Sequence, residues 1–163
     1  MKDEKVLVGA ATLGAIAGMR AMSAPALVSQ LARKGGLAVE GSKLGFLNSS
    51  GALSTTALLA VGELIADKLP FIPSRTTPGP LIARAISGGV SGAIISSARR
   101  KSPWAGALIG AGAAIGAAYA AYHLRRAAKE RLRVPDFVLA LAEDALVASA
   151  GTFVARRLSA REA

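Results

Sequence analysis

Long apolar stretches alternate with short polar ones along the whole of this chain. A helix needs about 20 largely apolar residues to cross a bilayer, and five stretches come close to that length: residues 6–32, 44–66, 81–98, 104–122 and 137–155. No useful run alternates apolar and polar residues with the period of a β-strand. The pattern therefore predicts one all-α domain over residues 1–163, a polytopic helical membrane protein with about five hydrophobic helices.

The first of these stretches is expected to be broken. Arg20 interrupts its apolar sequence, and Gly18 and Pro25 lie on either side of the charge. Proline removes a backbone donor and obstructs the preceding turn of a helix. Irregular backbone within a membrane must be buried in protein or line a cavity. Segment 6–32 is therefore predicted to contain a break or to be re-entrant.

The composition strengthens the membrane interpretation. Hydrophobic residues make up 52% of the 163 residues and charged residues 18%, below the roughly 25% of a typical soluble domain. Aromatic residues are scarce at 4%, whereas there are 18 glycines, so the helices are expected to pack closely through small residues. Cysteine is absent, which excludes thiolate catalysis, disulfides and cysteine-based metal sites.

The formal net charge of +10 comes from basic residues that fall in short groups between the apolar stretches. No aromatic residues are interleaved with these groups to stack on bases, so nucleic acid is not expected as a partner. Basic groups beside hydrophobic spans fit the anionic head groups of membrane lipids. If all five stretches span, the basic residues on the two sides nearly cancel. This leaves two explanations open: dual topology with antiparallel dimers, or a re-entrant segment.

Two segments of the chain echo each other. Residues 7–18 and 108–119 share a glycine- and alanine-rich pattern, and an acid-bearing segment follows each of them in its half of the chain. Inverted repeats with a binding site at their interface are a recurrent plan among transporters. The echo therefore suggests an inverted repeat, and we also expect the protein to form a homo-oligomer.

Four acidic residues lie within or beside the apolar stretches. Glu63 and Asp67 are four residues apart, so their carboxylates face the same side of a helix. Glu143 and Asp144 lie near the middle of the fifth stretch, where adjacent side chains point about 100° apart, so that one faces a site while the other finds a different partner. Ionisable groups at such depth are costly unless paired or hydrated, and they mark a functional site by default.

Three arginines are the matching cations. Arg20 and Arg84 each interrupt an apolar stretch, and a buried guanidinium can donate two hydrogen bonds to a carboxylate or to an anionic ligand. Arg75 lies among hydroxyl residues in the proline-rich connector 69–80. That group of donors fits an anion, and an ordinary capped turn explains it equally well. Pairing of Glu63 with Arg84 or Arg20 would be a purely structural role for these charges.

The chain resembles an uncharacterised family of small bacterial integral membrane proteins, the domain of unknown function DUF4126. The resemblance lies in "GMRAMSAPA" at 18–26, in "GELIADKLPFIPSRTTPGPLIARAISG" at 62–88 and in "ALAEDAL" at 140–146. It implies a multi-pass protein of the bacterial inner membrane. It also implies that seven residues occupy family motif positions: Arg20, Glu63, Asp67, Arg75, Arg84, Glu143 and Asp144.

These features predict a small transporter or channel-like carrier for an ion or a small polar solute. The four carboxylates favour a cation or a proton-coupled step, with Glu63 and Asp67 as the coordinating pair. The alternative is a non-transporting membrane scaffold that binds lipid or a partner. No P-loop, G-x-S-x-G or H-E-x-x-H motif is present, and no nucleophile is visibly paired with a base. We therefore expect neither enzymatic activity nor a cofactor, and the sequence leaves a metal undecided.

Overall fold

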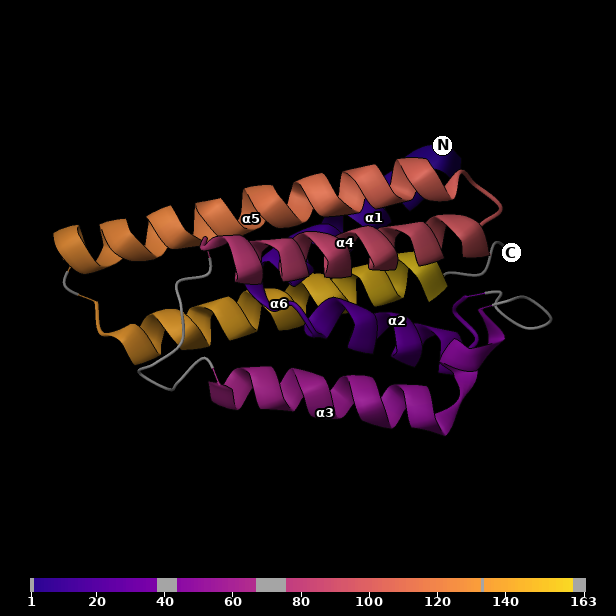
Figure 1. Ribbon diagram of the computed structural model, residues 1–163, viewed down its shortest axis with the longest axis horizontal. Helices are drawn as coiled ribbons and strands as arrows, with labels where there is room; N and C mark the ends of the chain where they lie inside the picture. Colours follow the sequence, from indigo (N-terminus) through magenta and orange to yellow (C-terminus); the bar gives the residue numbers. More distant parts are fainter. Residues whose placement is uncertain (1, 38–43, 67–75, 133, 160–163) are drawn as a thin grey trace.

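The computed structural model of the protein describes residues 2–37, 44–66, 76–132 and 134–159, and all regular structure in these ranges is helical. The prediction of an all-α fold is thereby confirmed. Six α-helices and one short 3-10 helix follow one another along the chain (Figure 1). They are α1 (Lys2–Met19), α2 (Ser23–Arg33), η1 (Gly45–Asn48), α3 (Ser50–Ala66), α4 (Pro78–Ala98), α5 (Pro103–Leu132) and α6 (Asp136–Ser159).

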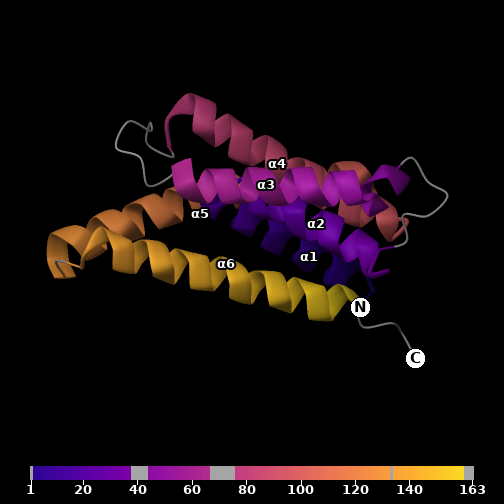
Figure 2. The ribbon, with the colours of Figure 1, turned by 90° about the horizontal axis from the view of Figure 1, so that it is seen from below.

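The six α-helices run alternately in opposite directions (Figure 1). Helix α1 crosses the bundle, and α2 then runs back, so the predicted first segment, 6–32, forms two helices that meet at residues 20–22. Helix α1 begins and α6 ends at the same end of the bundle, here called the terminal end. Helices α5 and α6 meet at the opposite end, where they extend beyond the other helices (Figures 1 and 2).

Glycines bring three of the helices, α1, α4 and α5, into direct backbone contact. A Cβ atom added to Gly14 or to Gly88 would overlap the carbonyl oxygen of Gly110, and one added to Gly92 would overlap that of Gly106. Only glycine permits this approach, which is the close helix packing that small residues provide in membranes. Helices α1, α4 and α5 therefore form the tightly packed centre of the bundle.

Larger apolar side chains fill the space around this centre. Leu13 and Ile16 from α1, Val28 from α2, Ile95 from α4 and Val154 from α6 are at most 2% exposed. They belong to one continuous core cluster. Helices α2 and α6 are thus joined to the centre by side-chain packing, and α3 lies outside them, mainly against α2 and η1.

Three helices are long and apolar enough to cross a membrane: Pro78–Ala98, Pro103–Arg131 and Phe137–Arg157. Their outer faces carry large exposed apolar side chains, such as Leu108 at 74% exposure and Phe137 at 65%. Contiguous apolar surface of this kind suits lipid better than water. The fold is therefore compatible with the membrane protein that the sequence predicts, with three such helices among the described residues in place of five.

Two further expectations bear on the arrangement. The six observed helices replace the five predicted ones because the first stretch divides at Arg20. The two segments that echo each other, 7–18 and 108–119, lie in α1 and α5, and these helices pack directly against each other. Contact between these two helices is not evidence that the two halves of the chain are related by an inverted repeat. The inverted repeat therefore stays a prediction.

Candidate functional site at the helix break

The break between α1 and α2 leaves backbone groups without helical partners. The amide of Arg20 still bonds the carbonyl oxygen of Ile16 at 2.7 Å, and that of Ser23 bonds the carbonyl oxygen of Arg20 at 3.2 Å. Between them lie the amides of Ala21 and Met22, which stand at the start of α2. A helix start of this kind presents unsatisfied donors and a partial positive charge. Inside a membrane these donors require acceptors from the protein itself.

Glu63 of α3 supplies both acceptors. Its Oε1 accepts a 2.7 Å hydrogen bond from the amide of Ala21, and its Oε2 accepts one of 2.8 Å from the amide of Met22. The carboxylate thus caps α2 from another helix, where the partial charge of the helix start favours an anion. Arg84 of α4 adds a cation, since its Nη2 lies 3.7 Å from Oε1 of Glu63.

Helix α4 contributes a second contact to the break. The hydroxyl of Ser87 donates a short hydrogen bond to the carbonyl oxygen of Ala21. Within α4 itself, Nη1 of Arg84 donates a hydrogen bond of 3.4 Å to the carbonyl oxygen of Pro80. Ser87 and Arg84 are 6% and 5% exposed. The donor and the acceptor of the Ala21 peptide groups are therefore both satisfied by side chains from other helices.

Arg20 links the break to a fourth helix. Its Nε and Nη2 donate hydrogen bonds of 3.0 and 2.6 Å to the same atom, Oδ1 of Asp144 on α6. Arg20 is buried at 3% exposure, whereas the side chain of Asp144 is 36% exposed. Removing the carboxylate would take the Asp144 ion pair away from a buried guanidinium, which is costly.

Glu143 takes a different direction from its neighbour Asp144, as their helical spacing predicts. It is 9% exposed and lines a cavity of about 230 Å³ together with Met19 of α1, Arg125 of α5 and mostly apolar side chains of α5 and α6. The cavity involves the parts of α5 and α6 that approach the opposite end of the bundle. We call it the far cavity.

A groove of about 540 Å³ lies on the other side of the break. It follows α2 from Ser23 to Lys34, with α3 on one side and α6 on the other (Figure 2). Ser23 directly follows the capped amides, and Lys34 directly follows α2 at the terminal end. We call this the terminal groove. The break therefore borders a cavity on the side of one end of the bundle and a groove on the side of the other.

The structure brings four of the seven predicted residues together: Arg20, Glu63, Arg84 and Asp144, here called the charged cluster. Glu143 lies beside the cluster and lines the far cavity. Asp67 and Arg75 lie outside the described residues, so the predicted pairing of Asp67 with Glu63 stays a prediction. Among the described residues, no group of three or more His, Asp and Glu could hold a metal ion.

Sequence reasoning missed Ser87 and the two amides. Ser87 lies three residues after Arg84, which places both on one face of α4, and this spacing is the signal that could have identified it. The amides of Ala21 and Met22 follow from the predicted break, since any break within a membrane leaves donors that need partners. What the sequence does not reveal is that Glu63 supplies them.

A family model described as "Domain of unknown function (DUF4126)" matches residues 7–156. The chain belongs to this family. The match includes every residue of the charged cluster, as well as Ser87 and Glu143. No curated protein and no solved structure matches the chain. DUF4126 carries no assigned activity, so the function has to be inferred from the site.

Proposed function

We propose that this protein is a small transporter or channel-like carrier of the bacterial inner membrane, and that an ion or a small polar solute passes by the charged cluster. One observation carries the proposal. The far cavity is lined by Met19, directly before the break, and the terminal groove by Ser23, directly after it, and the two extend toward opposite ends of the bundle. Broken helices whose ends face a site between two access routes are a recurrent feature of transporters.

The chemistry of the cluster fits a site that works by exchange of partners. Both acids of the charged cluster pair with a guanidinium in the structure: Glu63 with Arg84, and Asp144 with Arg20. A proton or cation that reaches one of these carboxylates competes with the guanidinium for it. Because weakening the ion pair of a buried arginine is costly, such an event favours movement of the helices that carry the pair. The proposal therefore couples ion arrival to rearrangement of the break.

Helix α3 is the element best suited to move. It packs mainly against α2 and η1, and Glu63 connects it by hydrogen bonds to the break and by charge to α4. It also forms one wall of the terminal groove through Leu53, Ala57 and Ala60. Release of Glu63 would therefore loosen the wall of the groove that leads toward the terminal end.

Ion flux into liposomes tests the proposal directly. We expect the purified wild-type protein to conduct protons or a monovalent cation, and Glu63→Gln and Asp144→Asn to lower that flux at least about tenfold, since intramembrane acids are functional by default. Glu130→Gln is the matched control, because Glu130 pairs with Arg126 at 2.8 Å on an exposed face. Equal flux from the wild type, both cluster variants and empty liposomes would exclude the transport role.

The orientation forms part of the same proposal. The described Lys and Arg residues near the terminal end outnumber those near the opposite end. The first group is Lys5, Arg33, Lys34, Arg99, Arg100, Lys101, Arg156 and Arg157, and the second is Arg125, Arg126, Lys129 and Arg131. Positive charge favours the cytoplasmic side of a membrane. The terminal end is therefore expected to face the cytoplasm. In this cysteine-free chain, we expect an impermeant maleimide added outside intact cells to label Glu130→Cys and to spare Ser102→Cys.

A scaffold role is the second candidate, and the capping by Glu63 favours it. Both oxygens of this carboxylate already bond backbone amides, which is what a purely structural group does. A scaffold predicts that Glu63→Gln destabilises the solubilised protein and that no variant changes ion flux. A transporter predicts a loss of flux in Asp144→Asn protein that remains folded, because Asp144 is partly exposed and caps no helix.

A further inference from the structure

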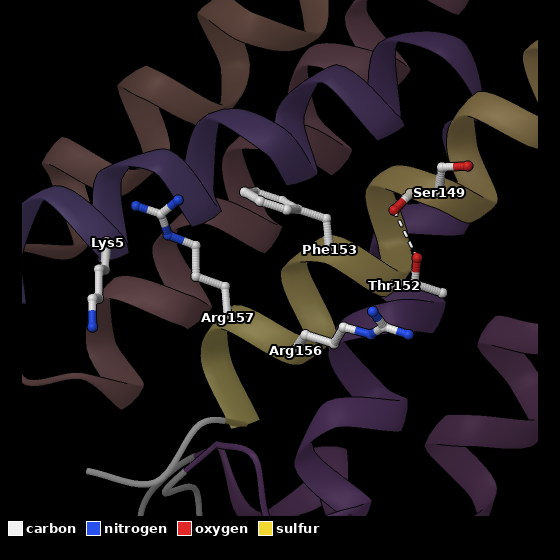
Figure 3. Close-up of a pocket in the computed structure, with 6 residues that line it drawn as sticks. All are labelled: Lys5, Ser149, Thr152, Phe153, Arg156 and Arg157. Carbon is white, nitrogen blue, oxygen red and sulfur yellow. Dashed lines mark hydrogen bonds between the residues drawn. The ribbon is translucent and has the colours of Figure 1, made fainter.

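A second group of charged residues lies away from the break, at the terminal end of the bundle. An open pocket of about 510 Å³ lies between the start of α1 and the end of α6. We call it the terminal pocket, and Figure 3 shows the residues that line it. Six residues line it: Lys5, Ser149, Thr152, Phe153, Arg156 and Arg157. Lys5 comes from α1 and the other five come from the last turns of α6, so the pocket depends on the packing of these two helices.

Among the described residues, the lining of this pocket contains three cations and no carboxylate. The guanidinium of Arg157 lies over the ring of Phe153, with 5.5 Å between its central carbon and the ring centroid. The Nε of Arg157 is buried and has no hydrogen-bond partner among the described residues. The charged cluster at the break differs in this respect, since acids accompany its arginines. The terminal pocket therefore offers positive charge to an anion.

The two hydroxyls of the pocket supply acceptors. The hydroxyl of Ser149 donates a hydrogen bond to the carbonyl oxygen of Ala145 at 2.7 Å. The hydroxyl of Thr152 donates one to the carbonyl oxygen of Ser149 at 2.8 Å (Figure 3). Both oxygens keep lone pairs for a donor from outside. A ligand that combines an anionic group with a nearby hydroxyl would use the cations and these acceptors together.

The position of the pocket along α6 limits the source of that ligand. The apolar segment of α6 that is suited to cross a membrane runs from Phe137 to Arg157, so Arg156 and Arg157 lie at its last turn. Such a turn lies at the depth of the lipid head groups, where basic side chains meet phosphates. Phe153 is 47% exposed and offers an apolar surface beside the cations for the upper part of an acyl chain.

We propose that the terminal pocket binds the phosphodiester of an anionic phospholipid with a hydroxyl-bearing head group, such as phosphatidylglycerol. Lys5, Arg156 and Arg157 neutralise the phosphodiester, and the oxygens of Ser149 and Thr152 accept hydrogen bonds from the head-group hydroxyls. The pocket shares no lining residue with the far cavity or the charged cluster, and among its described lining residues only Thr152 also lines the terminal groove.

Native mass spectrometry of the full chain, released from detergent with added lipid, tests the site. We expect phosphatidylglycerol to bind saturably and more tightly than phosphatidylcholine. The double variant Arg156→Gln, Arg157→Gln should weaken that binding about tenfold or more, since each basic side chain near a lipid surface contributes about 1 kcal/mol. Lys5→Gln tests the pocket from the other helix and should weaken binding to a smaller degree.

The control is Arg126→Gln, Arg131→Gln, which removes two exposed arginines of α5 toward the opposite end, both outside the lining of the far cavity. It should retain wild-type binding. Equal weakening in the control and in the α6 variant would overturn the proposal, because it would show attraction by net charge alone. Saturation by inorganic phosphate, with no preference between the two lipids, would overturn the lipid assignment. If the α6 double variant does not fold, Lys5→Gln alone decides, and unchanged binding by it overturns the site.

Discussion

Helices α5 and α3 are both largely apolar, yet the bundle holds them by different means. Helix α5 contacts α1 and α4 backbone to backbone through glycines such as Gly106 and Gly110. Helix α3 exposes Leu58, Val61 and Ile65 at 72, 52 and 61%, and its link to the break is the carboxylate of Glu63. Steric fit thus fixes α5, whereas α3 packs against α2 and η1 and is joined to the break by polar bonds that a proton or ion can alter.

The largest effect is expected where the close approach is removed. Gly110→Leu forces a side chain into the backbone of Gly88 on α4, so α4 and α5 must separate. Overpacking of this kind costs about 3 kcal/mol or more. We expect loss of the folded protein, measured as yield of monodisperse material and by thermal unfolding in detergent.

Gly112→Leu is the matched control on the same helix, because a Cβ at Gly112 meets no atom within 4 Å. It should unfold at nearly the wild-type temperature. If both variants unfold alike, α5 is not fixed by the glycine contacts, and the contrast with α3 loses its basis.

The next effect is expected at the link between α3 and the break. Glu63→Gln keeps one acceptor oxygen, but it leaves one amide of the break without its acceptor and removes the negative charge that lies 3.7 Å from Arg84. An unsatisfied buried donor costs about 1–3 kcal/mol. Hydrogen exchange followed by mass spectrometry should show faster exchange in α3 and at residues 21–23, with α4 and α5 unchanged. Faster exchange spread evenly over all helices would contradict a local attachment.

A smaller effect is expected from Asp144→Asn. Its partner Arg20 is buried, but Asp144 is 36% exposed, and asparagine keeps an oxygen that can accept a hydrogen bond from the guanidinium. We expect a cost of about 1 kcal/mol in the free energy of unfolding, between the values for exposed and buried pairs. Denaturant titration in bicelles measures it. A cost as large as that of Glu63→Gln would mean that exposure of Asp144 does not weaken the pair.

The sequence alone predicts the helical class, the break near Arg20 and the residues of the charged cluster. Apolar length and the charge within the first stretch carry this information, because a membrane penalises both unpaired backbone and isolated charge. The partners of those charges are harder to predict. Arg20 pairs with Asp144, which is 124 residues away, and no local pattern relates the two residues.

The number of helices and the balance of charge could not be predicted for one shared reason. A break at Arg20 can lie within a single bent span or between two helices that double back, and the residues around it fit both. The structure has the second arrangement, so the start of α1 and the end of α2 share the terminal end. Lys5 therefore lies at the same end of the bundle as Arg33 and Lys34, and the described basic residues are more numerous at that end than at the other.

The smallest effect is expected from Glu130→Ala. Comparing it with Asp144→Asn tests whether burial sets the contribution of an ion pair to stability. Glu130 and Arg126 pair on α5 at 2.8 Å, a distance similar to the 2.6 Å between Asp144 and Arg20. Both partners are more than 60% exposed, so water and salt screen the pair and its contribution is small. We expect the unfolding temperature of Glu130→Ala to equal that of the wild type at 0.5 M NaCl, while Asp144→Asn remains less stable in the same buffer. A comparable loss of stability in both variants would show that distance, rather than burial, sets the strength of these ion pairs. The Arg20–Asp144 pair would then contribute no more to stability than an exposed pair.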